Sequence, residues 1–171
     1  CRNLGLNEAR GEFLAWTDCD DVNLPTRFEK QINFLINNPD FGGCGTWISR
    51  FQNNTTYFIS KAQYDPEFIK ASLLFTPAAI PNATVMLRME DIRKHDFTYN
   101  TQLPIGEDFD FIFKCSKVMK FTNIQESLYN YRDSENSIMN HFNGFQEKSF
   151  EVNKIIYDQI LKEFGLNLTA D

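Results

Sequence analysis

The stretch GEFLAWTDCDDVNLP (residues 11–25) decides the fold expected for this chain. The apolar run from Phe13 to Thr17 is typical of a short strand buried in a parallel sheet. Three carboxylates follow within four positions, at Asp18, Asp20 and Asp21. Like charges this close repel one another unless water or a positive charge separates them. Because open α/β sheets bind ligands at the carboxyl ends of their strands, the stretch predicts a ligand site at this strand end.

The sequence around this stretch predicts an alternation of helices and strands. After Pro25, Phe28, Ile32, Leu35 and Ile36 recur at helical spacing and are expected to face the core. The other expected elements are a helix over residues 2–10, a β-hairpin over 42–60, a helix over 65–75, a strand over 83–88, a helix over 106–118, a strand over 127–132 and a helix at about 143–164. This order predicts one α/β domain over residues 1–171, with a mixed sheet flanked by helices.

Composition excludes several functional classes. The 171 residues are 42% hydrophobic and 15% aromatic, which is typical of a globular protein. A net charge of −6 offers no basic surface for nucleic acid. The four cysteines form no CxxC pair, which indicates a reducing compartment without a thiolate metal site. The chain begins at Cys1, inside an expected helix, so we expect a further segment to precede it.

The three carboxylates have more than one explanation. Oxygen ligands suit Mg²⁺ or Mn²⁺, and Mg²⁺ usually completes its shell with water and phosphate, which predicts a phosphate-bearing ligand. A solvated acidic loop, in which Asp21 or Asn23 caps the next helix, explains the same spacing about as well. An EF-hand is rejected because Pro25 interrupts the loop. An aspartate-nucleophile phosphatase stays open as an alternative.

A second acidic stretch, IGEDFDF, places Glu107 and Asp108 at the start of the expected helix over residues 106–118. Carboxylates are favourable there because of the helix dipole, and this alone can explain them. The functional alternative is a general base that faces the same cleft as the first carboxylates. In a phosphatase the same pair could serve as the second carboxylate pair.

Five motifs in order resemble those of family 2 glycosyltransferases, nucleotide-sugar-dependent enzymes with the Rossmann-like GT-A fold. Residues 1–21 resemble the Ala-Arg-Asn-x-Gly block, the Ala-x-Gly turn and the Asp-x-Asp-Asp strand end of the family. The other resembling stretches are LPTRFEKQINFLINNPDFGGCGT (residues 24–46), VMLR (85–88), GEDFDF (106–111) and YNYRDSENSI (129–138). The family usually opens with a nucleotide-binding strand and helix that this chain lacks, so the resemblance implies an N-terminally truncated fragment. The late loop has Ser134 where the family often has a histidine.

The resemblance implies a role for each of five residues. Asp20 matches the aspartate that binds a divalent cation, Mn²⁺ or Mg²⁺, bridging the donor diphosphate, and Asp18 matches the donor-side aspartate. Asp108 matches the base that takes the proton of the acceptor hydroxyl, with Glu107 orienting the loop or the acceptor. Arg132 lies where the late loop of the family approaches the diphosphate.

The implied activity is inverting, metal-dependent hexosyl transfer from a nucleotide sugar to a glycan or lipid-linked acceptor, in bacterial surface polysaccharide synthesis. A metal-dependent phosphatase and a non-catalytic binding remnant are the alternatives. We expect a cytoplasmic protein at the inner face of the membrane. The C-terminal helix is expected to pack on the domain, and a peripheral membrane contact is left open.

Overall fold

The structure is a computed structural model that describes residues 1–53, 55–103, 105–133, 154–162 and 165. Its elements are α1 (Arg2–Glu8), β1 (Phe13–Ala15), β2 (Val22–Asn23), α2 (Arg27–Asn37), β3 (Phe41–Gln52), β4 (Thr55–Ser60), α3 (Pro66–Ser72), the 3₁₀ turns η1 (Pro77–Ala79) and η2 (Asn82–Thr84), β5 (Met86–Arg88), α4 (Met89–Lys94), α5 (Glu107–Ser116) and β6 (Lys120–Arg132). Residues 154–162 are helical as well. The rest of the helix expected at 143–164, and the loop after Asp133, lie outside the described residues.

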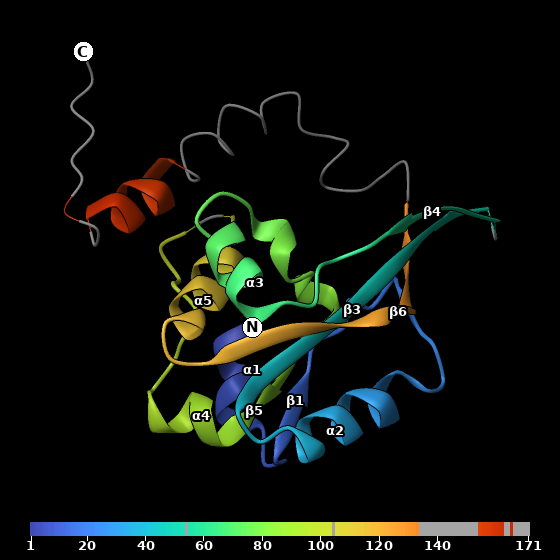
Figure 1. Ribbon diagram of the computed structural model, residues 1–171, viewed down its shortest axis with the longest axis horizontal. Coiled ribbons are helices and arrows are strands. Elements are labelled where there is room, and N and C mark those ends of the chain that lie inside the picture. Colours follow the sequence, from blue (N-terminus) through green and yellow to red (C-terminus); the bar gives the residue numbers. More distant parts are fainter. Residues whose placement is uncertain (54, 104, 134–153, 163–164, 166–171) are drawn as a thin grey trace.

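The strands form one mixed sheet, as the sequence predicts. Their order is β1-β5-β3-β6-β2, with β4 paired to β3. The long strands β3 and β6 run parallel at the centre, whereas β4 and β5 are antiparallel to β3 (Figure 1). The parallel central pair confirms a mixed α/β sheet.

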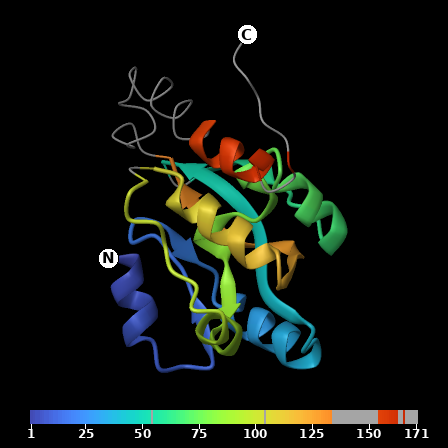
Figure 2. The ribbon, with the colours of Figure 1, turned by 90° about the vertical axis from the view of Figure 1, so that its left-hand side faces the viewer.

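Helices cover both faces of this sheet. One core packs α1, α3, α4, α5 and the C-terminal helix against the sheet, and a smaller core around Leu35 packs α2 against the other face. Adjacent residues of β5 serve the two cores, since Met86 belongs to the smaller and Leu87 to the larger, as alternation along a strand requires. In Figure 1, α3 and α5 lie above the sheet and α2 lies below it. Figure 2 shows the C-terminal helix, in red, beside α5.

The connection between β1 and β2 is held against the far end of β6. Val22 of β2 pairs with Asn130, and Asn23 pairs with Tyr129. The main-chain N–H of Leu24 also donates to the carbonyl of Leu128, at 3.0 Å. The loop that carries the three early carboxylates therefore lies beside the last residues of β6, more than 100 positions away in the sequence.

Strand β1 differs from the expectation of a buried parallel strand. It occupies one end of the described sheet, pairs only with β5, and does so antiparallel. Its three residues, Phe13–Ala15, are half-buried. An apolar run predicts a buried strand, but the hydrophobic pattern cannot show how many neighbouring strands a short strand has.

The buried face of α2 matches the expected one at Leu35 and differs from it at Phe28 and Ile36. Phe28 and Ile36 are 41% and 58% exposed, whereas Arg27, Gln31 and Leu35 are buried. The amide of Gln31 donates to the carbonyls of Cys44 at 2.9 Å and Thr84 at 2.8 Å. The helix turns this polar row inward because buried main-chain carbonyls need donors.

Other local predictions are confirmed. The carboxylate of Asp65 caps α3 by accepting the N–H of Phe68 at 2.7 Å. On α5, Phe109, Ile112 and Phe113 are buried in the core, as their spacing predicts. Within the described part of the chain, no helix has the length and apolar character needed to cross a membrane.

Candidate functional site

The loop of residues 18–21 is bonded directly to the end of β6. The hydroxyl of Tyr129 accepts the main-chain N–H of Asp18 at 3.0 Å and donates to Asp21 Oδ2 at 2.8 Å. The main-chain N–H of Arg132 donates to Asp21 Oδ1 at 2.7 Å, and Arg132 Nε–H donates to the carbonyl of Asp20 at 2.8 Å. Both oxygens of Asp21 are therefore engaged within the fold.

The carboxylates of Asp18 and Asp20 are exposed and, among the described residues, make no hydrogen bond or ion pair. The protein packed around Asp18 raises the pKa of its carboxyl group. The charge of Arg2 lowers this pKa, whereas the charges of Asp20 and Asp108 raise it further. The fold thus brings Asp108 within electrostatic reach of the Asp18 loop, which spacing alone could not establish.

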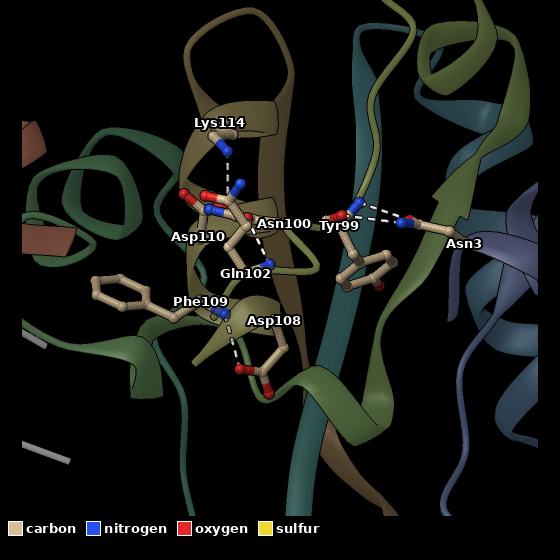
Figure 3. Close-up of polar contacts among 8 residues, drawn as sticks. All are labelled: Asn3, Tyr99, Asn100, Gln102, Asp108, Phe109, Asp110 and Lys114. Atoms are coloured by element: carbon tan, nitrogen blue, oxygen red, sulfur yellow. Dashed lines mark hydrogen bonds and ion pairs between the residues drawn. The ribbon is translucent and has the colours of Figure 1, made fainter. Parts of the chain in front are cut away.

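Asp108 is the second residue of α5 and lies in its first turn. The residue before this helix, Gly106, has a φ of 73°, a left-handed conformation that favours glycine and sets the direction in which the helix starts. Asp108 Oδ1 accepts the N–H of Phe109 at 2.8 Å. Figure 3 shows Asp108 and Asp110 leaving α5 in different directions, and Asp110 is buried and paired with Lys114 at 2.6 Å. Asp108, by contrast, is half-buried and makes no ion pair among the described residues.

Glu107, next to Asp108, is neutralised by a cation. Its Oε1 lies 2.5 Å from Arg2 Nη1, and both side chains are about one-third exposed. The guanidinium of Arg2 also lies 5.5 Å from the centre of the Tyr99 ring, within range of a cation–π interaction. Arg2 therefore links α1 to the start of α5, and its charge also acts on Asp18.

The N-terminal helix is fixed next to this site. The side chain of Asn3 exchanges two hydrogen bonds with the main chain of Tyr99, at 2.7 and 2.9 Å (Figure 3). The Tyr99 ring meets Trp16 edge to face at 5.9 Å. Within the described residues, the Trp16 indole N–H and the Tyr99 hydroxyl are buried without a hydrogen-bond partner.

A divalent cation would need more ligands than the described residues provide. They contain no group of three or more histidine, cysteine or acidic side chains able to hold a metal ion. The free carboxylates of Asp18 and Asp20 still fit Mg²⁺ or Mn²⁺, since Mg²⁺ commonly takes one or two carboxylates and completes its shell with water and phosphate. The arrangement suits a cation held jointly by the protein and a phosphate-bearing ligand.

The structure brings all five predicted site residues to one region and adds two that sequence reasoning missed. Asp18, Asp20 and Arg132 meet at the β6 end, with Asp108 in electrostatic reach and Glu107 beside it. The added residues are Arg2 and Tyr129, and Tyr129 bonds Asp21, one of the three carboxylates named from the sequence. Arg2 and Tyr129 are part of the motifs quoted above, but their partners lie too far away in the sequence for a pattern to reveal.

Comparison with known proteins places this chain in a class of transferases. The family model described as Glycosyl transferase family 2 matches residues 1–97. An uncharacterized glycosyltransferase of Methanocaldococcus jannaschii is 29% identical over 77% of this chain and 45% of its own length. The O-antigen biosynthesis glycosyltransferase WbnJ of Escherichia coli is 28% identical over 76% of this chain and 51% of its own length. The chain belongs to glycosyl transferase family 2.

Solved structures confirm the GT-A fold. S. aureus TarS 1–349 in complex with UDP-GlcNAc superimposes with a TM-score of 0.69 at 19% identity, covering 94% of this chain and 46% of that one. The mannosyltransferase PcManGT of Pyrobaculum calidifontis, in complex with GDP-Man and Mn²⁺, gives a TM-score of 0.56 at 11% identity, over 99% of this chain and 44% of that one. The chain thus spans about half the length of the relatives it matches.

Proposed function

We propose that this protein transfers a hexosyl group, with inversion, from a nucleotide sugar to a hydroxyl of a glycan or lipid-linked acceptor. Residues 1–171 would form the catalytic and acceptor-binding part of the domain. The observation that carries this proposal is that the free carboxylate of Asp18 lies within reach of the charges of both Asp20 and Asp108. Such a site offers charge for a donor complex on one side and a base for an acceptor on the other.

The donor side consists of the Asp18–Asp21 loop and Arg132. The carboxylates of Asp18 and Asp20 would hold the cation that accompanies the diphosphate, either Mn²⁺ or Mg²⁺. Such a cation supplies positive charge where the leaving diphosphate develops negative charge. The Arg132 guanidinium, anchored through its Nε–H on the carbonyl of Asp20, adds a fixed cation at the same place.

The acceptor side consists of the first turn of α5. Asp108 takes the proton of the acceptor hydroxyl as that oxygen attacks the anomeric carbon, and the bond from the anomeric carbon to the diphosphate oxygen breaks. Direct displacement of this kind inverts the anomeric configuration. Glu107, paired with Arg2, serves to orient this turn and the acceptor rather than to accept the proton.

Relatives support a nucleotide-sugar donor and a role in polysaccharide synthesis. A TarS structure contains UDP-GlcNAc, and the PcManGT structure contains GDP-Man and Mn²⁺. One matching relative acts in O-antigen biosynthesis, which supports a role in bacterial surface polysaccharide synthesis. We further propose that the reaction takes place in the cytoplasm, at the inner face of the membrane where lipid-linked acceptors lie.

A substrate panel tests this proposal. The full-length protein is incubated with Mn²⁺ or Mg²⁺, a membrane lipid extract as acceptor, and UDP-GlcNAc, UDP-glucose or GDP-mannose in turn. We expect one nucleotide sugar to release its nucleoside diphosphate while the sugar enters the acceptor, with the opposite anomeric configuration by NMR. Binding of each donor is measured in parallel by calorimetry.

The same panel includes p-nitrophenyl phosphate, to test the phosphatase alternative. Hydrolysis of this phosphomonoester without sugar transfer would favour a metal-dependent phosphatase. Binding of donors or glycans with no turnover under any condition would favour a non-catalytic role. Transfer with retention would contradict the direct displacement.

A further inference from the structure

The loop that carries Asp18 and Asp20 is held at its tip by one buried tyrosine. The Tyr129 side chain has no exposed surface, and its hydroxyl lies between the N–H of Asp18 and the carboxylate of Asp21. It accepts from the first at 3.0 Å and donates to the second at 2.8 Å. A single hydroxyl therefore ties both ends of the residue 18–21 segment to β6.

The base of the loop is held separately by Arg27, which is also fully buried. Its Nη2 donates to the carbonyl of Trp16 at 2.8 Å, and its Nη1 donates to Asn23 Oδ1. The guanidinium also lies 5.0 Å from the centre of the Tyr129 ring. The residue that holds the base of the loop therefore packs against the residue that holds its tip. This arrangement restrains the main chain on both sides of the carboxylates.

These bonds divide the three carboxylates into two groups. Asp21 uses both oxygens, one for Tyr129 and one for the main-chain N–H of Arg132. Asp18 and Asp20 contribute only main-chain atoms to the described hydrogen bonds with β6, so their carboxylates stay available. Aspartate is a common metal ligand, but the carboxylate of Asp21 holds the loop to β6 instead.

We infer that Tyr129 and Asp21 are positioning residues, which fix the loop so that Asp18 and Asp20 present their carboxylates in the orientation that a cation and diphosphate require. This inference rests on the proposed function, because it assigns the loop to the donor. Groups that orient metal ligands typically contribute about 10–100-fold to metal affinity or activity. Without the Tyr129 hydroxyl, the N–H of Asp18 and one oxygen of Asp21 lose their partner together.

The test uses Tyr129→Phe in the full-length protein, because this change removes one oxygen and keeps the buried ring. Free Mn²⁺ is titrated by electron paramagnetic resonance in the presence of UDP and, separately, of GDP. We expect Mn²⁺ to bind about 10–100-fold more weakly than in the wild type. The matched control is Tyr57→Phe in β4. This change also removes a tyrosine hydroxyl that is bonded to an aspartate, Asp133. This control should bind Mn²⁺ as the wild type does.

Asp21→Asn is the second variant, in case Tyr129→Phe does not fold. An asparagine has one acceptor oxygen, so it can serve only one of the two donors that Asp21 serves, and Mn²⁺ binding should weaken by a similar factor. Thermal unfolding of each variant is recorded alongside. A lowered melting temperature with unchanged Mn²⁺ binding would mean a purely structural role and would overturn the inference.

Two further outcomes separate this inference from the proposed function. If the wild type binds neither Mn²⁺ nor nucleotide under any condition, the proposed function itself fails. If the wild type binds both, and Asp21→Asn abolishes Mn²⁺ binding whereas Tyr129→Phe leaves it intact, Asp21 is a metal ligand rather than a positioning residue.

Discussion

Arg2 and Glu107, separated by 105 positions in the sequence, form an ion pair of 2.5 Å that joins α1 to the start of α5. The pair neutralises one of two adjacent carboxylates, whereas the other, Asp108, has among the described residues a hydrogen bond from the N–H of Phe109 and no ion pair. Consecutive helical residues point about 100° apart, so the two carboxylates cannot face one acceptor hydroxyl equally. This relationship distinguishes the two acidic residues by structure.

A double-mutant cycle measures this ion pair. Arg2→Met, Glu107→Gln and the double variant are unfolded with urea. Because both side chains are about one-third exposed, we expect a coupling free energy of up to about 1 kcal/mol. The coupling should decrease at high salt, since exposed charges are screened. Strictly additive effects at low salt would show that the two residues do not interact in solution.

Asp20→Asn should remove metal binding while leaving the fold intact. The asparagine keeps the size of the side chain but loses the charge, so Mn²⁺ affinity should fall by at least about ten-fold. Turnover should fall with it, whereas the melting temperature without metal should not decrease. The control is Asp40→Asn, an exposed aspartate in the turn before β3. Normal metal dependence in Asp20→Asn would mean that this carboxylate is not a ligand.

Asp18→Asn should stabilise the metal-free protein at neutral pH. The folded-state pKa of Asp18 is raised, first by the surrounding protein, so the folded state holds this proton more tightly than the unfolded state does. The stability that Asp18 contributes is therefore greatest in acid and is lost as the pH rises through its folded pKa. We expect a higher melting temperature at pH 7 in EDTA, with the difference vanishing in acid, where the carboxyl group is protonated in both the folded and the unfolded state. A lower melting temperature at pH 7 would contradict this.

Arg27→Met should destabilise the fold by about 2–4 kcal/mol. The buried guanidinium donates to Trp16, Asn23 and Gln31, and burial lowers its pKa to about 10. Methionine fills the space of the stem but leaves these acceptors without a donor. Urea unfolding checks the value, with Arg10→Met as the exposed control. A loss below about 0.5 kcal/mol, the size of an ordinary surface substitution, would show that Arg27 is not a structural centre.

Much of the fold could be predicted because local rules decide it. The α3 cap at Asp65 and the apolar spacing on α5 depend on residues within a few positions of each other. The inward face of α2 could not be predicted from periodicity, because Arg27 and Gln31 are buried by carbonyls of distant segments. The same limit applies to β1, because its apolar run cannot show that it pairs with one strand, β5, in the described sheet.

The candidate site was predictable in its chemistry and not in its geometry. A strand followed by Asp18 and Asp20, and a helix that begins with Glu107 and Asp108, identify the carboxylates. No pattern shows that Asp21 is bonded to a tyrosine 108 positions away, since such a contact exists only after the sheet has formed. The family resemblance gives roles to Asp18 and Asp20 and none to Asp21, and the structure shows that both oxygens of Asp21 are bonded within the fold.

The central claim is that Asp108 accepts the proton of the acceptor hydroxyl, and single-turnover transfer tests it most directly. Full-length Asp108→Asn and Glu107→Gln are each mixed with saturating donor and acceptor, and the rate of the chemical step is measured. Asp108→Asn should lower this rate by about 10²–10⁴-fold with donor affinity nearly unchanged, because it removes a general base. Glu107→Gln should act mainly through acceptor binding. Near-normal chemistry in Asp108→Asn, with chemistry abolished in Glu107→Gln, would contradict the assignment.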